Sequence, residues 1–79
     1  MFSSQLFRNQ LYVCEVSVRR PASGGVELMM MPSQSDIVPE SEDVYHLRHR
    51  GRSFRIHILQ NFTFGPETRL SIEVGEQEL

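Results

Sequence analysis

The strongest constraint on the fold is a pair of alternating segments, residues 44–49 and 52–59, on either side of Arg50-Gly51. A two-residue loop that ends in glycine is typical of the mirror-image turns of β-hairpins, which need positive φ. This turn pairs His49 with Arg52. The register then gathers five apolar side chains on one face: Tyr45, Leu47, Phe54, Ile56 and Ile58. A slip of one residue would mix the two faces, so the pattern specifies its own register.

The opposite face of this predicted hairpin is basic. His46 lies across from Arg55, Arg48 lies across from Ser53, and His57 falls near the start of the first strand. Residues 46–55 hold four arginines and no acidic residue. The hairpin therefore has one face for a core and one cationic face.

Residues 12–20 and 26–31 alternate in the same way and predict a second hairpin. Between them, residues 21–25 supply a proline that fixes φ and two glycines that accept positive φ. The side chains that we expect to point inward are Tyr12, Cys14, Val16 and Val18 from the first strand and Val26, Leu28 and Met30 from the second.

The remaining segments are less regular. The even-numbered alternation continues after residue 58 through Gln60, Phe62 and Phe64, so this strand either runs on or bulges near Gln60-Asn61. A turn at residues 65–67 precedes a last strand carrying Leu70, Ile72 and Val74. Residues 75–79 form an acidic tail.

Two further regions complete the chain. Ser3 or Ser4 is placed to cap a short helix that carries Leu6 and Phe7, although the glutamate or glutamine of a capping box is missing. Residues 33–43 carry four acidic groups and no basic one, so we expect a mobile acidic loop anchored only by Ile37-Val38.

These segments make residues 1–79 a single small domain without an internal repeat. The expected fold class is all-β, or mainly β with one short helix. Five strands in meander order indicate a small antiparallel five-stranded barrel or a half-open sandwich.

The 79-residue length leaves only a thin core. Cys14 is the only cysteine, so neither an internal disulfide nor a zinc framework is available, and a homodimer is the expected way to gain stability. No apolar run approaches the ~18 residues of a membrane span, and the N-terminus lacks the features of a signal peptide. We expect a cytoplasmic protein, or a phage product that acts in the cytoplasm.

The sequence carries no motif for catalysis. Gly51–Arg55 lacks the second glycine of a nucleophile elbow, and no phosphate-binding or dinucleotide fingerprint is present. Cys14 stands among apolar residues and is expected to act as a small core side chain. His46 and His57 share a face, but a metal would need a third ligand, and the neighbouring arginines oppose a cation. We therefore expect no enzyme activity, no cofactor and no metal.

The cationic hairpin face has three interpretations: a binding site for phosphates, carboxylates or an acidic protein surface, a solvated face, or a face neutralised by residues 33–43. Met29-Met30-Met31 places at least one methionine on the outside of an edge-like strand. Methionine adapts well to binding surfaces, and core filling with a dimer contact is an equally good explanation.

The leading hypothesis is a non-enzymatic protein-binding protein: a regulator, an inhibitor or an accessory subunit. Its predicted partner-binding residues are His46, Arg48, Arg50, Arg52, Arg55, His57, Met29 and Met31. The alternative is a nucleic-acid-binding module with the four arginines on phosphates and Tyr12 or Tyr45 as stacking groups. The net charge of −2 and the inward positions expected for both tyrosines weigh against that alternative. An enzyme with a substrate pocket ranks third.

Overall fold

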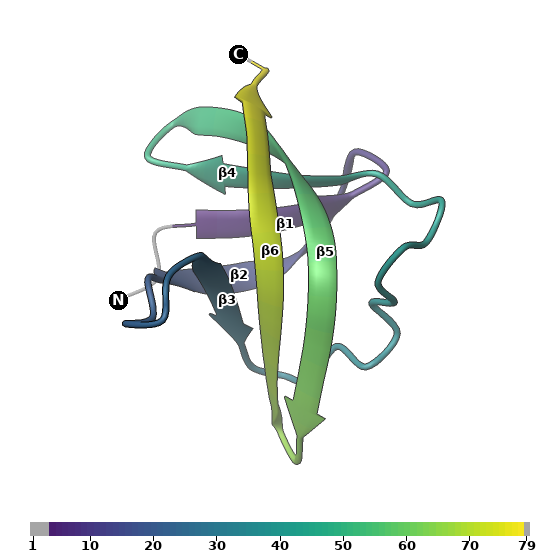
Figure 1. The fold of residues 1–79 in the computed structure, drawn as a ribbon. Coiled ribbons are helices and arrows are strands. Elements are labelled where there is room, and N and C mark those ends of the chain that lie inside the picture. The colour runs from purple at the N-terminus through teal and green to yellow at the C-terminus, as the bar shows by residue number, and fades with distance from the viewer. Residues whose placement is uncertain (1–3, 79) are drawn as a thin grey trace.

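The computed structural model describes residues 4–78 and arranges them in six antiparallel strands (Figure 1). The strands are β1 (Ser4–Arg8), β2 (Leu11–Arg19), β3 (Val26–Met30), β4 (Tyr45–His49), β5 (Arg52–Phe64) and β6 (Glu67–Gln77). Residues 4–78 contain no helix, and hence none long and apolar enough to cross a membrane.

The strands form a closed barrel in the order β1-β2-β3-β6-β5-β4, in which β1 also pairs with β4. Four hairpins and one long connection, residues 31–44, account for the whole topology. The expected small antiparallel barrel is confirmed. The strand count is six rather than five, because the segment expected to form a short helix is β1. The expected meander order is wrong, because β3 pairs with β6 and not with β4.

β1 forms a strand because it has a pairing partner on each side, β2 and β4. It pairs with β2 through Leu6 and Cys14 and with β4 through Leu6 and Leu47. Leu6 is fully buried in the core between them. Of the two serines considered as helix caps, Ser3 lies outside the described residues, and Ser4 is a buried member of β1.

The β4–β5 hairpin has the predicted register. Tyr45 pairs with Ile56, Leu47 with Phe54 and His49 with Arg52. Arg50 and Gly51 have φ values of 53° and 75°, the positive values that a mirror-image turn requires.

A bulge in β2 changes the direction of Tyr12. Leu6 pairs with Cys14, but Phe7 pairs with Tyr12, so Val13 is an extra residue in the ladder. Val13 packs against the core and Tyr12 is 56% exposed. The inward position expected for Tyr12 is therefore wrong, whereas Tyr45 is buried as expected.

A second bulge has the same effect in β5. Ile58 pairs with Ile72 and Gln60 pairs with Ser71, so the extra residue is Leu59, one position before the predicted bulge. After this bulge, odd-numbered rather than even-numbered residues of β5 point inward. Phe62 and Phe64 are exposed, which contradicts the continued even-numbered alternation.

β6 continues into the segment that was expected to be a tail. Phe54 pairs with Gln77 and Ile56 with Val74, so two residues of β6 lie opposite Arg55 alone. One of them is Gly75, where an added Cβ would lie 3.0 Å from the carbonyl oxygen of Arg55. Glycine thus allows β6 to follow β5 closely at this point.

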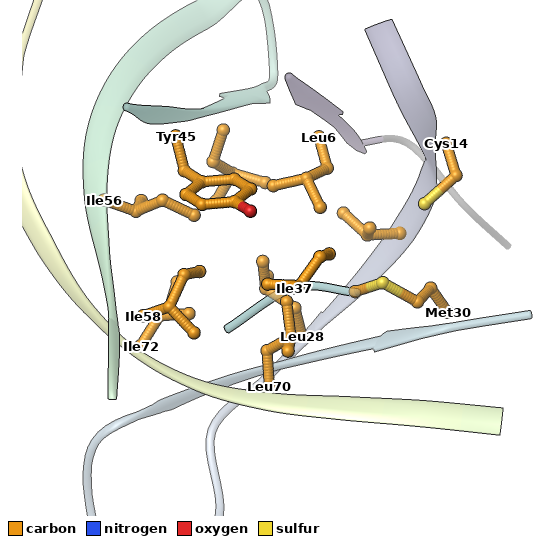
Figure 2. Close-up of a cluster of buried hydrophobic side chains, with 12 residues drawn as sticks. Leu6, Cys14, Leu28, Met30, Ile37, Tyr45, Ile56, Ile58, Leu70 and Ile72 are labelled. Atoms are coloured by element: carbon orange, nitrogen blue, oxygen red, sulfur yellow. The ribbon is translucent and has the colours of Figure 1, made fainter. Parts of the chain in front are cut away.

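The core fills the barrel, and the long connection contributes to it (Figure 2). Ile37 is 1% exposed and lies among Leu28, Ile58 and other core side chains. The Asn61 amide donates hydrogen bonds to the carbonyls of Gln34 (2.9 Å) and Ile37 (2.8 Å). This part of the acidic segment is therefore fastened to the barrel, while mobility of residues 38–43 stays a prediction.

Ile37 and Val38 provide a direct test of how much the connection contributes to stability. We expect Ile37→Ala to lower the free energy of unfolding in urea by about 2–4 kcal/mol, because it leaves a cavity in the core. Val38→Ala is the matched control and should change it by less than about 0.5 kcal/mol, since Val38 is 56% exposed. Equal effects of the two substitutions would show that the connection does not close the core.

Candidate functional site

Four arginines of the β4–β5 hairpin make up what we call the cationic face: Arg48, Arg50, Arg52 and Arg55. All four are exposed, and none forms an ion pair or a side-chain hydrogen bond with another residue in the range 4–78. Their guanidinium groups are consequently available to an external ligand.

The alternation of the hairpin turns Arg48 and Arg55 outward. Arg50 lies in the turn, and Arg52, the first residue of β5, has the parity of the inward-facing Phe54 and is exposed beside the turn. Leu47 is buried on one side of Arg48, and Ile56 is buried next to Arg55. Arg48 occupies an outer position between Gln5 of β1 and Ser53 of β5. The face thus extends from the turn across the barrel wall.

The acidic segment directs its contacts elsewhere. Asp36 forms an ion pair with Arg8 at 2.9 Å, and Asp43 accepts a hydrogen bond from the Asn9 amide at 2.9 Å. The Arg8 guanidinium lowers the pKa of Asp36 from its ordinary value, chiefly through this hydrogen bond. Among the described residues, segment 33–43 makes no ion pair with the cationic face, so it does not neutralise it.

A different carboxylate, that of Glu78, lies against the hairpin. Its Oε1 is hydrogen-bonded to Nε2 of His46, and its backbone nitrogen donates to the Ser53 carbonyl at 2.7 Å. Together with Phe7 and Arg48 these groups border a shallow concavity of about 340 Å³. His46 therefore already has an acidic partner within the chain, which sequence reasoning did not anticipate.

An aromatic pair continues the outer surface beyond His46. Phe7 pairs with His46 across β1 and β4, and its ring is 5.9 Å from that of Tyr12 at an interplanar angle of 73°. The Tyr12 hydroxyl donates to Glu15 at 2.9 Å, and this bond raises the pKa of the phenol. One outer row thus carries Tyr12, Phe7, His46 and Arg55.

His57 does not join His46 in a common site. It is exposed on β5 opposite Glu73 of β6, whereas His46 is bonded to Glu78. No group of three or more His, Cys, Asp or Glu side chains suited to a metal ion occurs in residues 4–78.

The two methionines belong to a separate surface. Met29 on β3 and Phe62 on β5 both lie opposite Arg69 of β6, and Phe64 lies opposite Glu67. Met31 follows directly after β3 and is 65% exposed. We call these four apolar side chains the Met/Phe patch: Met29, Met31, Phe62 and Phe64.

Sequence reasoning found only the methionines of this patch. The sequence left open whether the alternation continues or a bulge interrupts it near Gln60-Asn61, and the bulge at Leu59 is what turns the two phenylalanines outward. The edge-like position expected for β3 is also wrong, since β3 pairs with β2 on one side and β6 on the other.

Cys14 lies in the core, as its apolar neighbours predict. Burial raises the pKa of its thiol, and the charge of Glu15 raises it further. Both effects disfavour the thiolate, which is the nucleophilic form.

This environment predicts a slow reaction of Cys14 with a disulfide reagent such as DTNB. At pH 8 the folded protein should react at least about 100-fold more slowly than the protein unfolded in urea, because reaction requires opening of the barrel. The release of thionitrobenzoate measures both rates. Rapid stoichiometric labelling of the folded protein would contradict the core position of this thiol.

The geometry leaves two surfaces that a partner can reach, the cationic face and the Met/Phe patch. Of the eight predicted partner-binding residues, four belong to the cationic face and two to the Met/Phe patch. No protein-family model, curated protein or solved structure matches the chain.

Proposed function

We propose that the protein is a non-enzymatic binding module that holds an acidic surface of a partner protein on its cationic face. The observation that carries this proposal is the set of four exposed guanidinium groups on one hairpin without an ion-pair partner in residues 4–78. Such a module would act in the cytoplasm as a regulator, an inhibitor or an accessory subunit.

The chemistry of the face favours carboxylates. Arginine binds carboxylates through two parallel hydrogen bonds, and the chain has no lysine at all. The Glu78 carboxylate is already hydrogen-bonded to His46, so the hairpin accommodates one carboxylate at this position. A protein surface carries its negative charge on separate acidic side chains. These side chains can contact single arginines without approaching the Glu78 carboxylate.

Catalysis receives little support from the described residues. Their one serine–histidine hydrogen bond joins Ser4 Oγ to His49 Nδ1. Ser4 is 1% exposed, so a substrate carbonyl would not reach its oxygen. We therefore propose binding rather than hydrolysis.

The nucleic-acid alternative gains one specific observation. The exposed Tyr12 and the half-buried Phe7 lie in the same outer row as His46 and Arg55, and aromatic rings beside basic groups can stack with bases. Glu15 at Tyr12 and Glu78 at His46 place negative charge in this row, which opposes a phosphate backbone. We keep nucleic acid as the second candidate.

The Arg48→Ala/Arg55→Ala double variant tests the proposal. Binding of a fluorescent peptide rich in glutamate and aspartate, measured by anisotropy, should weaken at least about tenfold, because two charge-assisted contacts are lost. The thermal midpoint should move by no more than about 3 °C, since exposed charges contribute little to stability.

Arg19→Ala/Arg69→Ala is the matched control, because it removes the same charge from arginines that are paired with Glu27 and Glu67. If both double variants lowered the affinity for the acidic peptide equally, net charge alone would explain the effect. That result would contradict the proposal. Tighter binding of oligo(dT), with affinity falling by about 0.7 log unit per log unit of salt for each phosphate contact, would establish the nucleic-acid alternative instead.

We also propose that the protein forms a homodimer through the Met/Phe patch. The closed barrel removes most of the free strand edges on which the expectation of a dimer partly rested. The patch offers a better reason, because Phe64 is 71% exposed, Phe62 on the same strand is exposed, and Met31 after β3 is exposed as well. Apolar side chains exposed on one wall of a protein mark association surfaces.

Sedimentation velocity at about 50 μM should show a dimer for the unmodified chain and a monomer for Phe62→Ser/Phe64→Ser, since the substitutions remove the apolar contact. Leu11→Ser is the control, because Leu11 is equally exposed and belongs to β2, which carries no residue of the patch. A monomeric unmodified chain at this concentration would contradict the proposed dimer.

A further inference from the structure

The two ends of the barrel differ. At one end Ile37 from the long connection enters the core (Figure 2). Away from this plug, five of the six strands or their turns border a cavity of about 490 Å³ that is open to solvent. We call this cavity the mouth. Its walls are apolar and come from Val18, Val26, Leu47, Phe54 and Val74.

The charged groups at the mouth are all basic. Arg20 follows β2, and Arg50 stands in the β4–β5 turn. Both are exposed, and neither forms an ion pair within the described part of the chain. His49 also borders the cavity, and its ring is oriented by the hydrogen bond between Nδ1 and the buried Ser4 hydroxyl. No acidic side chain among residues 4–78 borders the mouth.

We propose that the mouth binds a small amphiphile, an apolar chain of about ten carbons that ends in a carboxylate. The apolar walls would bury the chain, and Arg20 and Arg50 would bind the carboxylate at the rim. The cavity has the size of sites that hold small ligands, which combine apolar walls with a few charged groups. A medium-chain fatty acid has this chemistry.

This site goes beyond the proposed protein-binding function and uses other residues. Arg48, Arg52 and Arg55 of the cationic face do not border the mouth, and Arg20 does not belong to the cationic face. Arg50 is the one residue common to both. The two proposals can consequently succeed or fail separately.

The first experiment is a calorimetric titration of the full chain with decanoate below its micelle concentration. We expect saturable binding of one decanoate per chain, with a Kd of roughly 10 μM to 1 mM for a ligand of this size. Decyltrimethylammonium has the same chain length and the opposite charge, and it should bind at least tenfold more weakly. Absence of saturation, or equal binding of the cation, would overturn the proposal.

Substitutions then locate the site. Arg20→Gln and Arg50→Gln should each weaken decanoate binding about tenfold, whereas Arg52→Gln in the same hairpin should leave it unchanged. Val74→Trp should abolish binding by filling the mouth, and Val74 is exposed enough to accept the larger side chain without repacking the core. A far-ultraviolet circular dichroism spectrum checks that each variant keeps its strands.

Unchanged decanoate affinity in both Arg20→Gln and Val74→Trp would overturn the site assignment. Arg20→Gln should leave binding of the acidic peptide unaltered, so a failure of this inference is distinguishable from a failure of the proposed function.

Discussion

The barrel depends on the pairing of β1 with both β2 and β4. Five residues of β1 supply hydrogen bonds to two neighbours and thereby join the β2–β3 hairpin to the β4–β5 hairpin. Without β1 the sheet would have two open edges, and a chain of this size gains little stability from such a sheet. Leu6, fully buried at the centre of β1, ties this backbone closure to the core. The mouth requires the closed form, because residues of five strands or their turns border it, whereas the cationic face lies on one hairpin.

The part of the fold that could be predicted is the part in which local pattern and turn chemistry agree. The β4–β5 hairpin is correct in each pair that was assigned, because the turn at Gly51 and the alternation on both sides specify the same register. The errors all arise where a single extra residue or a short segment is decided by distant contacts. Val13 and Leu59 invert the phase of their strands, and only the partner strand reveals this. β1 is too short for its period to distinguish a strand from a helix.

The candidate site was predictable to a similar degree. Arg48 and Arg55 point outward as expected because their neighbours Leu47 and Ile56 are apolar and buried. Their freedom from acidic partners could not be read from the sequence, which places an acidic segment directly before the hairpin. In the barrel, the acidic segment contacts Arg8 and Asn9 instead. The carboxylate that contacts the hairpin, at His46, is that of Glu78. Contacts between residues more than thirty positions apart, such as His46 and Glu78, follow from barrel closure and not from local pattern.

The bulge at Leu59 decides which side chains in the rest of β5 face the interior and which face the surface. With the extra residue in place, Asn61 and Thr63 face the interior, where Asn61 holds the long connection and Thr63 contacts Thr68. The same count turns Phe62 and Phe64 to the surface. The loss of one residue at this point would exchange the two sets, hiding the aromatic rings and releasing the connection together. The surface patch and the closed end of the barrel therefore both depend on the same inserted residue.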